Sequence, residues 1–298
     1  MSCRTVTAGI DGSRESLDAA DWAAREAELR DLPLRLLHAG TEADAPTHLP
    51  EVDVPAERAR TALDRAALQL SYAHPALKIV ARRIDDPPIP ALLQAAAESE
   101  ALVLGSRGFT AFAGFMVGSV ALAVASRAEH PVVLVRAGER PEDERLPYTD
   151  TAPLHRTPYR QVLLGLDLDH PSDELIAYAF DAAAHRHASL HVLHARTLPP
   201  LAGSYPAVPS LLPDEEDLRM AKSQALTATL QPWRHKYPDT PVTEKIVHGH
   251  PGHHLIKAAT GAGLLVIGRR RTTGPHLGHT AHSAIHHVTC PIAVVSHD

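Results

Sequence analysis

The sequence has little cysteine, few aromatic residues and no excess of basic charge. Cys3 and Cys290 are the two cysteines of the 298 residues, so no disulfide framework can form, and a reducing compartment is indicated. Aromatic residues make up only 4% of the chain, which leaves little for the stacking platforms that bind single strands. The formal net charge is −6, whereas broad nucleic-acid binding needs a basic face. We therefore expect no nucleic-acid partner.

The chain also lacks a hydrophobic signal region near Met1, so we expect a cytoplasmic protein. One uncharged stretch, residues 108–126, is long enough to span a bilayer. Glycine and serine interrupt it, and a glycine-rich loop followed by a buried helix explains the same residues better. We therefore expect no membrane contact.

Three common site motifs are missing. The pattern G-x-x-x-x-G-K-[ST] is absent, which excludes a P-loop nucleotidase. No G-x-G-x-x-G follows the first predicted strand, so a dinucleotide-binding fold is not supported. No G-x-S-x-G elbow of a serine hydrolase is present either.

What the chain does contain is an internal repeat. Four segments recur at offsets of 156 to 163 residues: Ala8–Asp11 in Leu164–Asp167, Leu36–Ala39 in Val192–Ala195, Leu102–Gly105 in Leu265–Gly268, and His130–Val133 in Cys290–Ala293. A proline-rich, charged stretch separates the copies. We predict one domain at residues 1–138, a linker at 139–157 and a second domain at 158–298.

Each copy alternates strands and helices. In the first copy the apolar periodicity predicts strands at 5–10, 34–39, 77–84, 101–104 and 132–135, and helices at 16–29, 56–70, 90–99 and 119–128. Short apolar strands between helices indicate a parallel sheet that is covered on both faces. The predicted fold is two tandem, doubly wound, mostly parallel five-stranded α/β domains. They are expected to pack as a pseudo-dimer, with strands 132–135 and 292–295 paired at the centre.

Two strand ends carry the candidate site, since ligands of such sheets bind beyond the carboxyl ends of strands. The first strand ends in Asp11, which can accept hydrogen bonds from ribose hydroxyls. The fourth ends in Gly105 and leads, through a loop, to Gly118 and Ser119. Ser119 can cap the next helix, whose free amides then point at phosphate. The alternative is that Gly105 and Gly118 serve only tight turns and close packing.

The spacing Gly105-x2-Gly108-x9-Gly118-Ser119 matches the ATP-binding pattern of the universal stress protein family at every specified position. Over nearly its whole length the chain resembles a tandem member of the actinobacterial type. The resemblance implies that Asp11 faces the ribose, the backbone at Ala39 the adenine, and the glycine loop the phosphates. The expected nucleotide contacts are Gly9, Asp11, Ala39, Gly105, Arg107, Gly108, Gly118, Ser119 and Val120. The implied ligand is ATP, with Mg²⁺ as a candidate companion; an unknown protein partner and a homodimer are further expectations.

The second copy departs from this pattern. Its loop from Gly268 to Gly278 is three residues shorter than the first, and His279 replaces the serine. Arg271 stands near the expected second glycine. Asp167 is retained, so recognition of adenosine stays open. Arg269 to Arg271 are interpreted as a solvated basic turn, with attraction of an anion as the alternative. We predict that the first half holds the nucleotide.

Histidines are concentrated in the second half, with 17 of 21 after residue 150. His282 and His286 are one helical turn apart, a spacing that can share a metal ion. No carboxylate completes either histidine cluster, so solvated or helix-capping histidines are favoured, with pH sensing as a minor alternative. We assign no metal site.

No residue pattern supports a dedicated reaction, and we assign no catalytic residue. The members of the family that the chain resembles act mainly as ATP-binding stress-adaptation proteins, so a regulatory ATP-binding protein is the leading hypothesis. One alternative is a non-enzymatic interaction scaffold whose site is vestigial or takes another adenine nucleotide. The other is a weak ATPase, which would need a metal ion and a positioned water.

Overall fold

The computed structural model describes residues 4–40, 54–106, 109–110, 114–115, 118–147, 157–196, 215–271, 274 and 276–298. The first half contains, in chain order, β1 (Thr5–Gly9), α1 (Arg14–Leu29), β2 (Leu34–Ala39), α2 (Val54–Ala73), β3 (Ile79–Ile84), α3 (Pro88–Ala97), β4 (Ser99–Ser106), β5 (Phe109–Thr110), β6 (Gly114–Phe115), α4 (Ser119–Ala125) and β7 (Val132–Arg136). Each predicted strand and helix is present, with ends that differ by a few residues. The short antiparallel pair β5–β6 was not predicted.

The second half repeats this order, without a counterpart of the β5–β6 pair among the described residues. Its elements are β8 (Gln161–Gly165), α5 (Asp173–His185), β9 (Leu190–Arg196), α6 (Glu215–Lys236), β10 (Val242–His248), α7 (Pro251–Ala259), β11 (Ala262–Arg270), α8 (His279–His287) and β12 (Ile292–His297). No helix within the described ranges is both long and apolar enough to cross a membrane.

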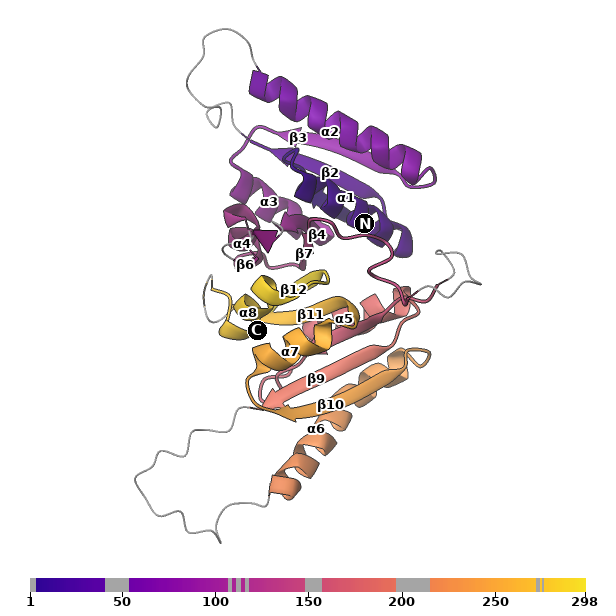
Figure 1. Ribbon diagram of the computed structural model, residues 1–298, viewed down its shortest axis with the longest axis vertical. Coiled ribbons are helices and arrows are strands. Elements are labelled where there is room, and N and C mark those ends of the chain that lie inside the picture. The colour runs from indigo at the N-terminus through magenta and orange to yellow at the C-terminus, as the bar shows by residue number, and fades with distance from the viewer. Residues whose placement is uncertain are drawn as a thin grey trace.

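All ten long strands form one sheet that runs through both halves (Figure 1). Its order is β10-β9-β8-β11-β12-β7-β4-β1-β2-β3. Neighbouring strands within each half are parallel, and the halves meet where β12 pairs with β7 in antiparallel register, Ala293 opposite Val133. The predicted pairing of the two last strands is therefore confirmed, as is the mostly parallel α/β class. A central pairing also leaves neither of these apolar strands as an open edge.

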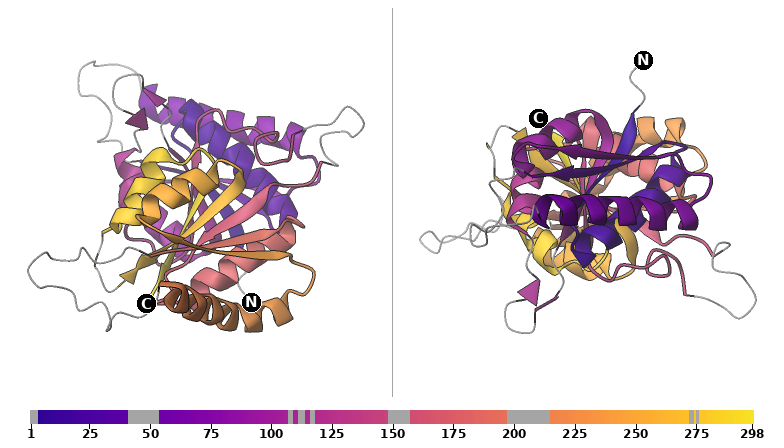
Figure 2. Two further views of the ribbon diagram at one scale, coloured as in Figure 1. Left: turned by 60° about the horizontal axis from the view of Figure 1, so that its bottom comes forward. Right: turned by 90° about the horizontal axis from the view of Figure 1, so that it is seen from above.

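Helices cover the sheet on both faces, so the molecule has three layers (Figure 2). One apolar core lies under α1, α2, α5 and α6, and the other under α3, α4, α7 and α8. Successive strand residues alternate between them: Val103 and Val133 belong to the first core, Leu104 and Leu134 to the second. Both cores continue across the β7–β12 seam, which is why the halves pack as one body.

The helices that open the two halves are set by serine caps and small side chains. The Ser13 hydroxyl accepts a hydrogen bond from the Ser16 amide at the start of α1, and Ser172 does the same for Leu175 in α5. Six buried residues of α1 are alanines or Trp22, and the alanines let the helix lie close to the strands. This close packing holds the turn after β1 at a fixed place beside β4.

A buried charge network joins α1 to α5. Glu26 is 1% exposed; its Oε1 accepts a hydrogen bond from Arg30 Nε at 2.6 Å, and its Oε2 pairs with Arg186 at the end of α5. Arg30 also pairs with Asp181 of α5. Burial opposes the charge of Glu26, but Arg186 and Arg30 outweigh it and lower its pKa to about 2. The two halves are thus connected by charges that neither half can satisfy alone.

The first part of the predicted linker packs against α1. Glu144 is buried and accepts hydrogen bonds from Arg25 at 2.7 and 3.0 Å. The guanidinium of Arg145 lies 4.0 Å from the ring centre of Tyr159. Residues 148–156 of that linker lie outside the described residues. Its described beginning is therefore part of the interface between the halves.

Candidate functional site

Each half has a cavity at the carboxyl ends of its strands. The cavity of the first half has a volume of about 630 Å³ and lies between the ends of β1, β2 and β4, α3 and the start of α4. Seven of the nine predicted contact residues line it: Gly9, Asp11, Ala39, Gly105, Gly118, Ser119 and Val120. The other two, Arg107 and Gly108, lie outside the described residues. Residues from three distant stretches of sequence are thereby brought to one place.

Asp11 is held by the turn that starts α1. Its Oδ1 accepts hydrogen bonds from the backbone amide of Ser13 at 2.9 Å and from the Ser13 hydroxyl at 2.5 Å. Partial burial raises the pKa of Asp11, but the hydrogen bonds from Ser13 and Ser16 outweigh it and hold the pKa below its ordinary value. Asp11 is therefore an oriented carboxylate at neutral pH, able to accept hydrogen bonds from a ligand.

Gly105 and Gly118, at the two ends of the loop, differ in whether their surroundings leave room for a side chain. A Cβ on Gly105 would lie 2.5 Å from the backbone carbonyl of Glu15, so α1 itself demands glycine there. A Cβ on Gly118 would meet no described atom within 4 Å, and the φ of Gly118 is −60°, which any residue can adopt. The close-packing alternative is thus correct for Gly105, but the described neighbours give no packing reason for Gly118.

The predicted cap of α4 is wrong. Gly118, not Ser119, occupies the N-cap position, and Ser119 is the first residue of the helix. The extended conformation at Gly118 ends the loop one residue earlier than the serine pattern suggested. Ser119 still lines the cavity, although its hydroxyl is not used as a cap.

Apolar side chains that the motif did not indicate form the other wall of the cavity. They are Leu37, Pro88, Leu92 and Leu104, from β2, the start of α3 and the end of β4. This apolar lining beside the backbone at Ala39 suits an apolar, planar group such as a nucleobase. Leu37 and Leu104 each lie near the carboxyl end of a strand, and such apolar strand-end residues could have predicted part of this wall from the sequence.

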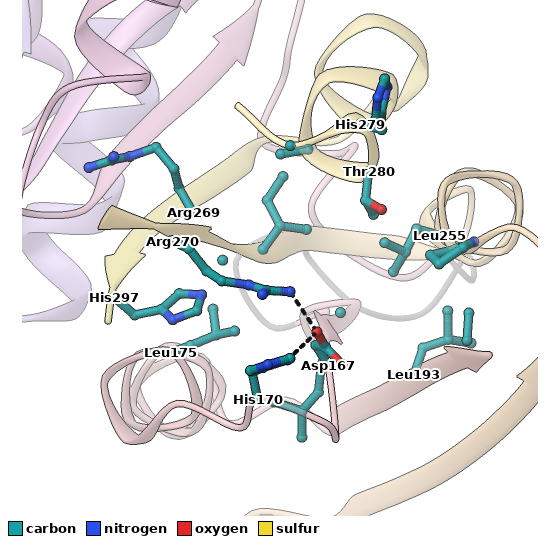
Figure 3. A pocket seen from close by; sticks show the side chains of 18 residues that line it. Asp167, His170, Leu175, Leu193, Leu255, Arg269, Arg270, His279, Thr280 and His297 are labelled. Atoms are coloured by element: carbon teal, nitrogen blue, oxygen red, sulfur yellow. Dashed lines mark hydrogen bonds and ion pairs between the residues drawn. The ribbon is translucent and has the colours of Figure 1, made fainter. Parts of the chain in front are cut away.

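The cavity of the second half, about 470 Å³, is built from equivalent positions, including Gly165, Asp167, Ala195, Gly268 and Gly278 (Figure 3). The hydrogen-bond partners of its aspartate, Asp167, differ from those of Asp11 in the first half. Oδ2 of Asp167 accepts a hydrogen bond from Arg270 Nη2 at 2.9 Å, and Nδ1 of His170 lies 3.4 Å from the same oxygen. Oδ1 accepts a hydrogen bond from the backbone amide of Asp169 at 3.1 Å.

The three arginines of the shortened loop do not form one solvated turn. Arg269 is 5% exposed and donates to the carbonyl of Ala128 at 2.6 Å and to the Ser296 hydroxyl at 2.8 Å. Arg271 pairs with Asp298 through two hydrogen bonds of 2.7 and 2.8 Å. The solvated-turn interpretation is therefore wrong for Arg269, whose strand continues through it to Arg270.

Arg269 has a counterpart in the other half. Arg136 of β7 is buried, and its Nη2 lies 3.5 Å from the carbonyl of Ile285 in α8. Each half thus sends an arginine to a carbonyl at or near the end of the other half's last helix, where the helix dipole favours a cation.

The histidines of α8 lie close together without forming a larger cluster. The ring centres of His282 and His286 are 4.4 Å apart. Slight burial, together with His286 and His279, lowers the pKa of His282. Within the part of the chain that the structure describes, no three histidine, cysteine, aspartate or glutamate side chains come together as a metal site.

Two repeated, doubly wound halves with a cavity at the strand ends of each define a tandem α/β protein. The Universal stress protein family profile matches residues 3–136 and again residues 158–296. This chain belongs to the universal stress protein family.

Individual relatives agree. A universal stress protein of Mycobacterium tuberculosis (strain ATCC 25618 / H37Rv) is 29% identical over 302 residues, covering 97% of this chain and 96% of its own. One of Mycolicibacterium smegmatis is 28% identical over 303 residues with the same coverage. The crystal structure of a universal stress protein from Archaeoglobus fulgidus DSM 4304 matches the fold with a TM-score of 0.68 over 99% of both chains, at 18% identity.

Proposed function

We propose that this chain is a cytoplasmic, ATP-binding regulatory protein of stress adaptation that holds one ATP in its first half. The observation that carries the proposal is the convergence of seven motif-predicted residues on one cavity. Gly118 strengthens it, because no described neighbour explains a glycine there. A glycine with free space above it is what the close approach of a phosphate would need.

In this arrangement the adenine base lies against the apolar lining beside Ala39 and Leu92. Asp11 accepts hydrogen bonds from the ribose hydroxyls, since its carboxylate is already oriented by Ser13. The triphosphate extends toward Gly118 and the first amides of α4, where the helix dipole favours negative charge. Arg107 and Gly108 complete the phosphate contacts by the family pattern. A Mg²⁺ ion that accompanies ATP would be bound mainly through the phosphate oxygens and water.

The second half is assigned no ATP. Its loop is shorter by three residues, and His279 lines the cavity where the first half has Ser119. Bulk at this position and the loss of loop amides both act against a triphosphate. The expected stoichiometry is therefore one ATP per chain.

A matched pair of substitutions tests the assignment. Gly118→Asp adds a negative side chain at the expected phosphate position, and we expect ATP affinity to fall at least tenfold, about 1.4 kcal/mol. Gly278→Asp makes the same change at the equivalent position of the second half, where a Cβ also meets no described atom within 4 Å. This control should keep the affinity of the unchanged chain.

Calorimetric titration of both folded variants with ATP gives the answer. Unchanged affinity in Gly118→Asp would refute the placement of phosphates on this loop. Mass spectrometry of any nucleotide released from the denatured, purified protein identifies the ligand that the cell supplies. Release of another adenine nucleotide would replace ATP in the proposal.

A further inference from the structure

The second cavity contains a side chain of the protein where a ligand group would be expected. Arg270 extends across the cavity toward Asp167, the counterpart of Asp11, and His170 approaches the same carboxylate from the other side (Figure 3). Arg270 Nη2 lies 2.9 Å and His170 Nδ1 lies 3.4 Å from Oδ2 of Asp167. The other oxygen accepts the backbone amide of Asp169. Both oxygens of Asp167 are therefore engaged by the protein.

The turn between the first strand and the first helix is longer in the second half than in the first. Helix α1 begins at Arg14, five residues after Gly9, whereas α5 begins at Asp173, eight residues after Gly165. The three added residues carry His170 to the side of Asp167. In the first half the shorter turn places Ser13 at the aspartate instead, and both of the Ser13 hydrogen bonds fall on one oxygen, Oδ1.

We propose that Arg270 is an internal occupant of the second cavity that takes the ribose position and closes this cavity to nucleosides. The inference rests on the proposed function, because it takes Asp11 as the ribose partner in the first half. A ribose diol is neutral, so it would have to replace a charge-assisted hydrogen bond with a weaker one. The guanidinium also fills the space beside Asp167 in which the sugar would lie.

The occupied volume is the stronger part of this effect. The side chains of Arg270 and Asp167 are 41% and 44% exposed, so solvent screens their attraction. An arginine that merely attracted the aspartate would be displaced by a ligand at small cost. An arginine that also stands in the place of the sugar must be moved as a whole before a nucleoside can enter.

The rest of the second cavity retains what a base needs. Leu193, Leu255 and Ile267 supply apolar walls, and Ala195 stands at the strand end that corresponds to Ala39. The Thr280 hydroxyl points into the cavity (Figure 3). Removing one side chain, that of Arg270, should therefore be enough to expose a working nucleoside site.

The test is a calorimetric titration of the full chain with adenosine. Adenosine lacks phosphates, so the shortened loop of the second half does not influence the result. We expect one equivalent bound by the unchanged chain and two by Arg270→Ala. Arg271→Ala is the matched control, since Arg271 is the next residue and an arginine, pairs with Asp298, and is absent from the cavity lining. It should still bind one equivalent.

Two further measurements show whether the site gained in Arg270→Ala recognises the ribose hydroxyls. Asp167→Asn in the Arg270→Ala background should return the stoichiometry to one. The ligand 2′,3′-dideoxyadenosine should bind the gained site at least tenfold more weakly than adenosine. A gained site that is indifferent to both changes would overturn the assignment of Arg270 to the ribose position.

The stoichiometries separate this inference from the proposed function. One equivalent in both the unchanged chain and a folded Arg270→Ala variant would overturn the inference and leave the first-half site intact. No adenosine bound by the unchanged chain but one equivalent bound by Arg270→Ala would support the inference for the second cavity and overturn the nucleoside contacts assigned to the first half. No adenosine bound by either chain would overturn the inference, and the ATP titration of Gly118→Asp and Gly278→Asp tests the proposed function separately. Circular dichroism and thermal unfolding of the variant establish that it is folded.

Discussion

Replacing Glu26 by glutamine should test how firmly the two halves are joined. Glu26 lies on α1, and its carboxylate is shared between Arg30 of the same helix and Arg186 of α5. The substitution keeps the shape of the side chain and removes its charge. It leaves two buried guanidinium groups, 4% and 1% exposed, without the carboxylate that they share.

The expected loss follows from the pKa of this carboxylate. Burial opposes ionisation, yet the two arginines lower the pKa from an ordinary value of 4.5 to about 2. That difference corresponds to about 3 kcal/mol of stability in favour of the ionised, folded state. Removal of one partner from a buried ion pair costs about 3–5 kcal/mol. We therefore expect Glu26→Gln to lower the free energy of unfolding by about 3–5 kcal/mol at neutral pH.

The pH dependence gives an independent check. Because the folded pKa is the lower one, the contribution of Glu26 is complete above pH 4.5 and is lost as the pH falls toward 2. Urea unfolding of both chains at pH 7 and pH 3 should therefore show a smaller difference at pH 3. Glu98→Gln is the control: Glu98 pairs with Arg35 but is 49% exposed, and its loss should cost less than about 1 kcal/mol.

Two results would refute this reasoning. A loss below about 1 kcal/mol for Glu26→Gln would mean that solvent or rearranged side chains replace the carboxylate. A difference from the unchanged chain that stays constant between pH 7 and pH 3 would mean that the effect of the substitution is unrelated to ionisation.

Two other predictions concern packing. Gly105→Ala should lower the free energy of unfolding by about 1–3 kcal/mol, because the new Cβ meets the backbone of Glu15 at 2.5 Å. Gly118→Ala, where the Cβ meets no described atom, should leave the thermal midpoint unchanged. Equal midpoints for the two variants would contradict the assigned contacts. Residues 1–138 and 158–298, produced separately, should each self-associate, because β7 or β12 becomes an exposed apolar edge. Analytical ultracentrifugation at high concentration should detect this, and two strictly monomeric halves would argue against it.

The fold was predictable because its signals are local and repeated. Apolar strands such as Val132–Arg136, entered through Pro131, recur at offsets of 156 to 163 residues, so the prediction for one half supports the prediction for the other. The pairing of the two closing strands followed from their apolar character, which an edge position would leave exposed. Strand ends also place their ligating residues at one edge of a parallel sheet, which is why Asp11 and Gly105 could be brought together from sequence.

Contacts between distant residues were beyond such reasoning. Glu26 and Arg186 are 160 positions apart, and nothing in either neighbourhood indicates the other. The pairing of Arg270 with Asp167 depends on where a shortened loop and a lengthened turn direct two side chains. The cap of α4 was misassigned because Gly118 and Ser119 both suit the N-cap position, and only the backbone path decides between them.

Arg269 and Arg136, which each contact a carbonyl of the other half, have a consequence for how the two copies of a duplicated protein diverge. Arg269 donates a hydrogen bond to the carbonyl of Ala128, which follows the end of α4 in the chain. The first residues of that helix line the first cavity. A half that no longer recognises a ligand of its own would still supply the brace for its neighbour's binding helix. We therefore expect substitutions in the second cavity to cost less stability than removal of the second half, which would take away this contact. Such a chain can retain two domains for the sake of one site.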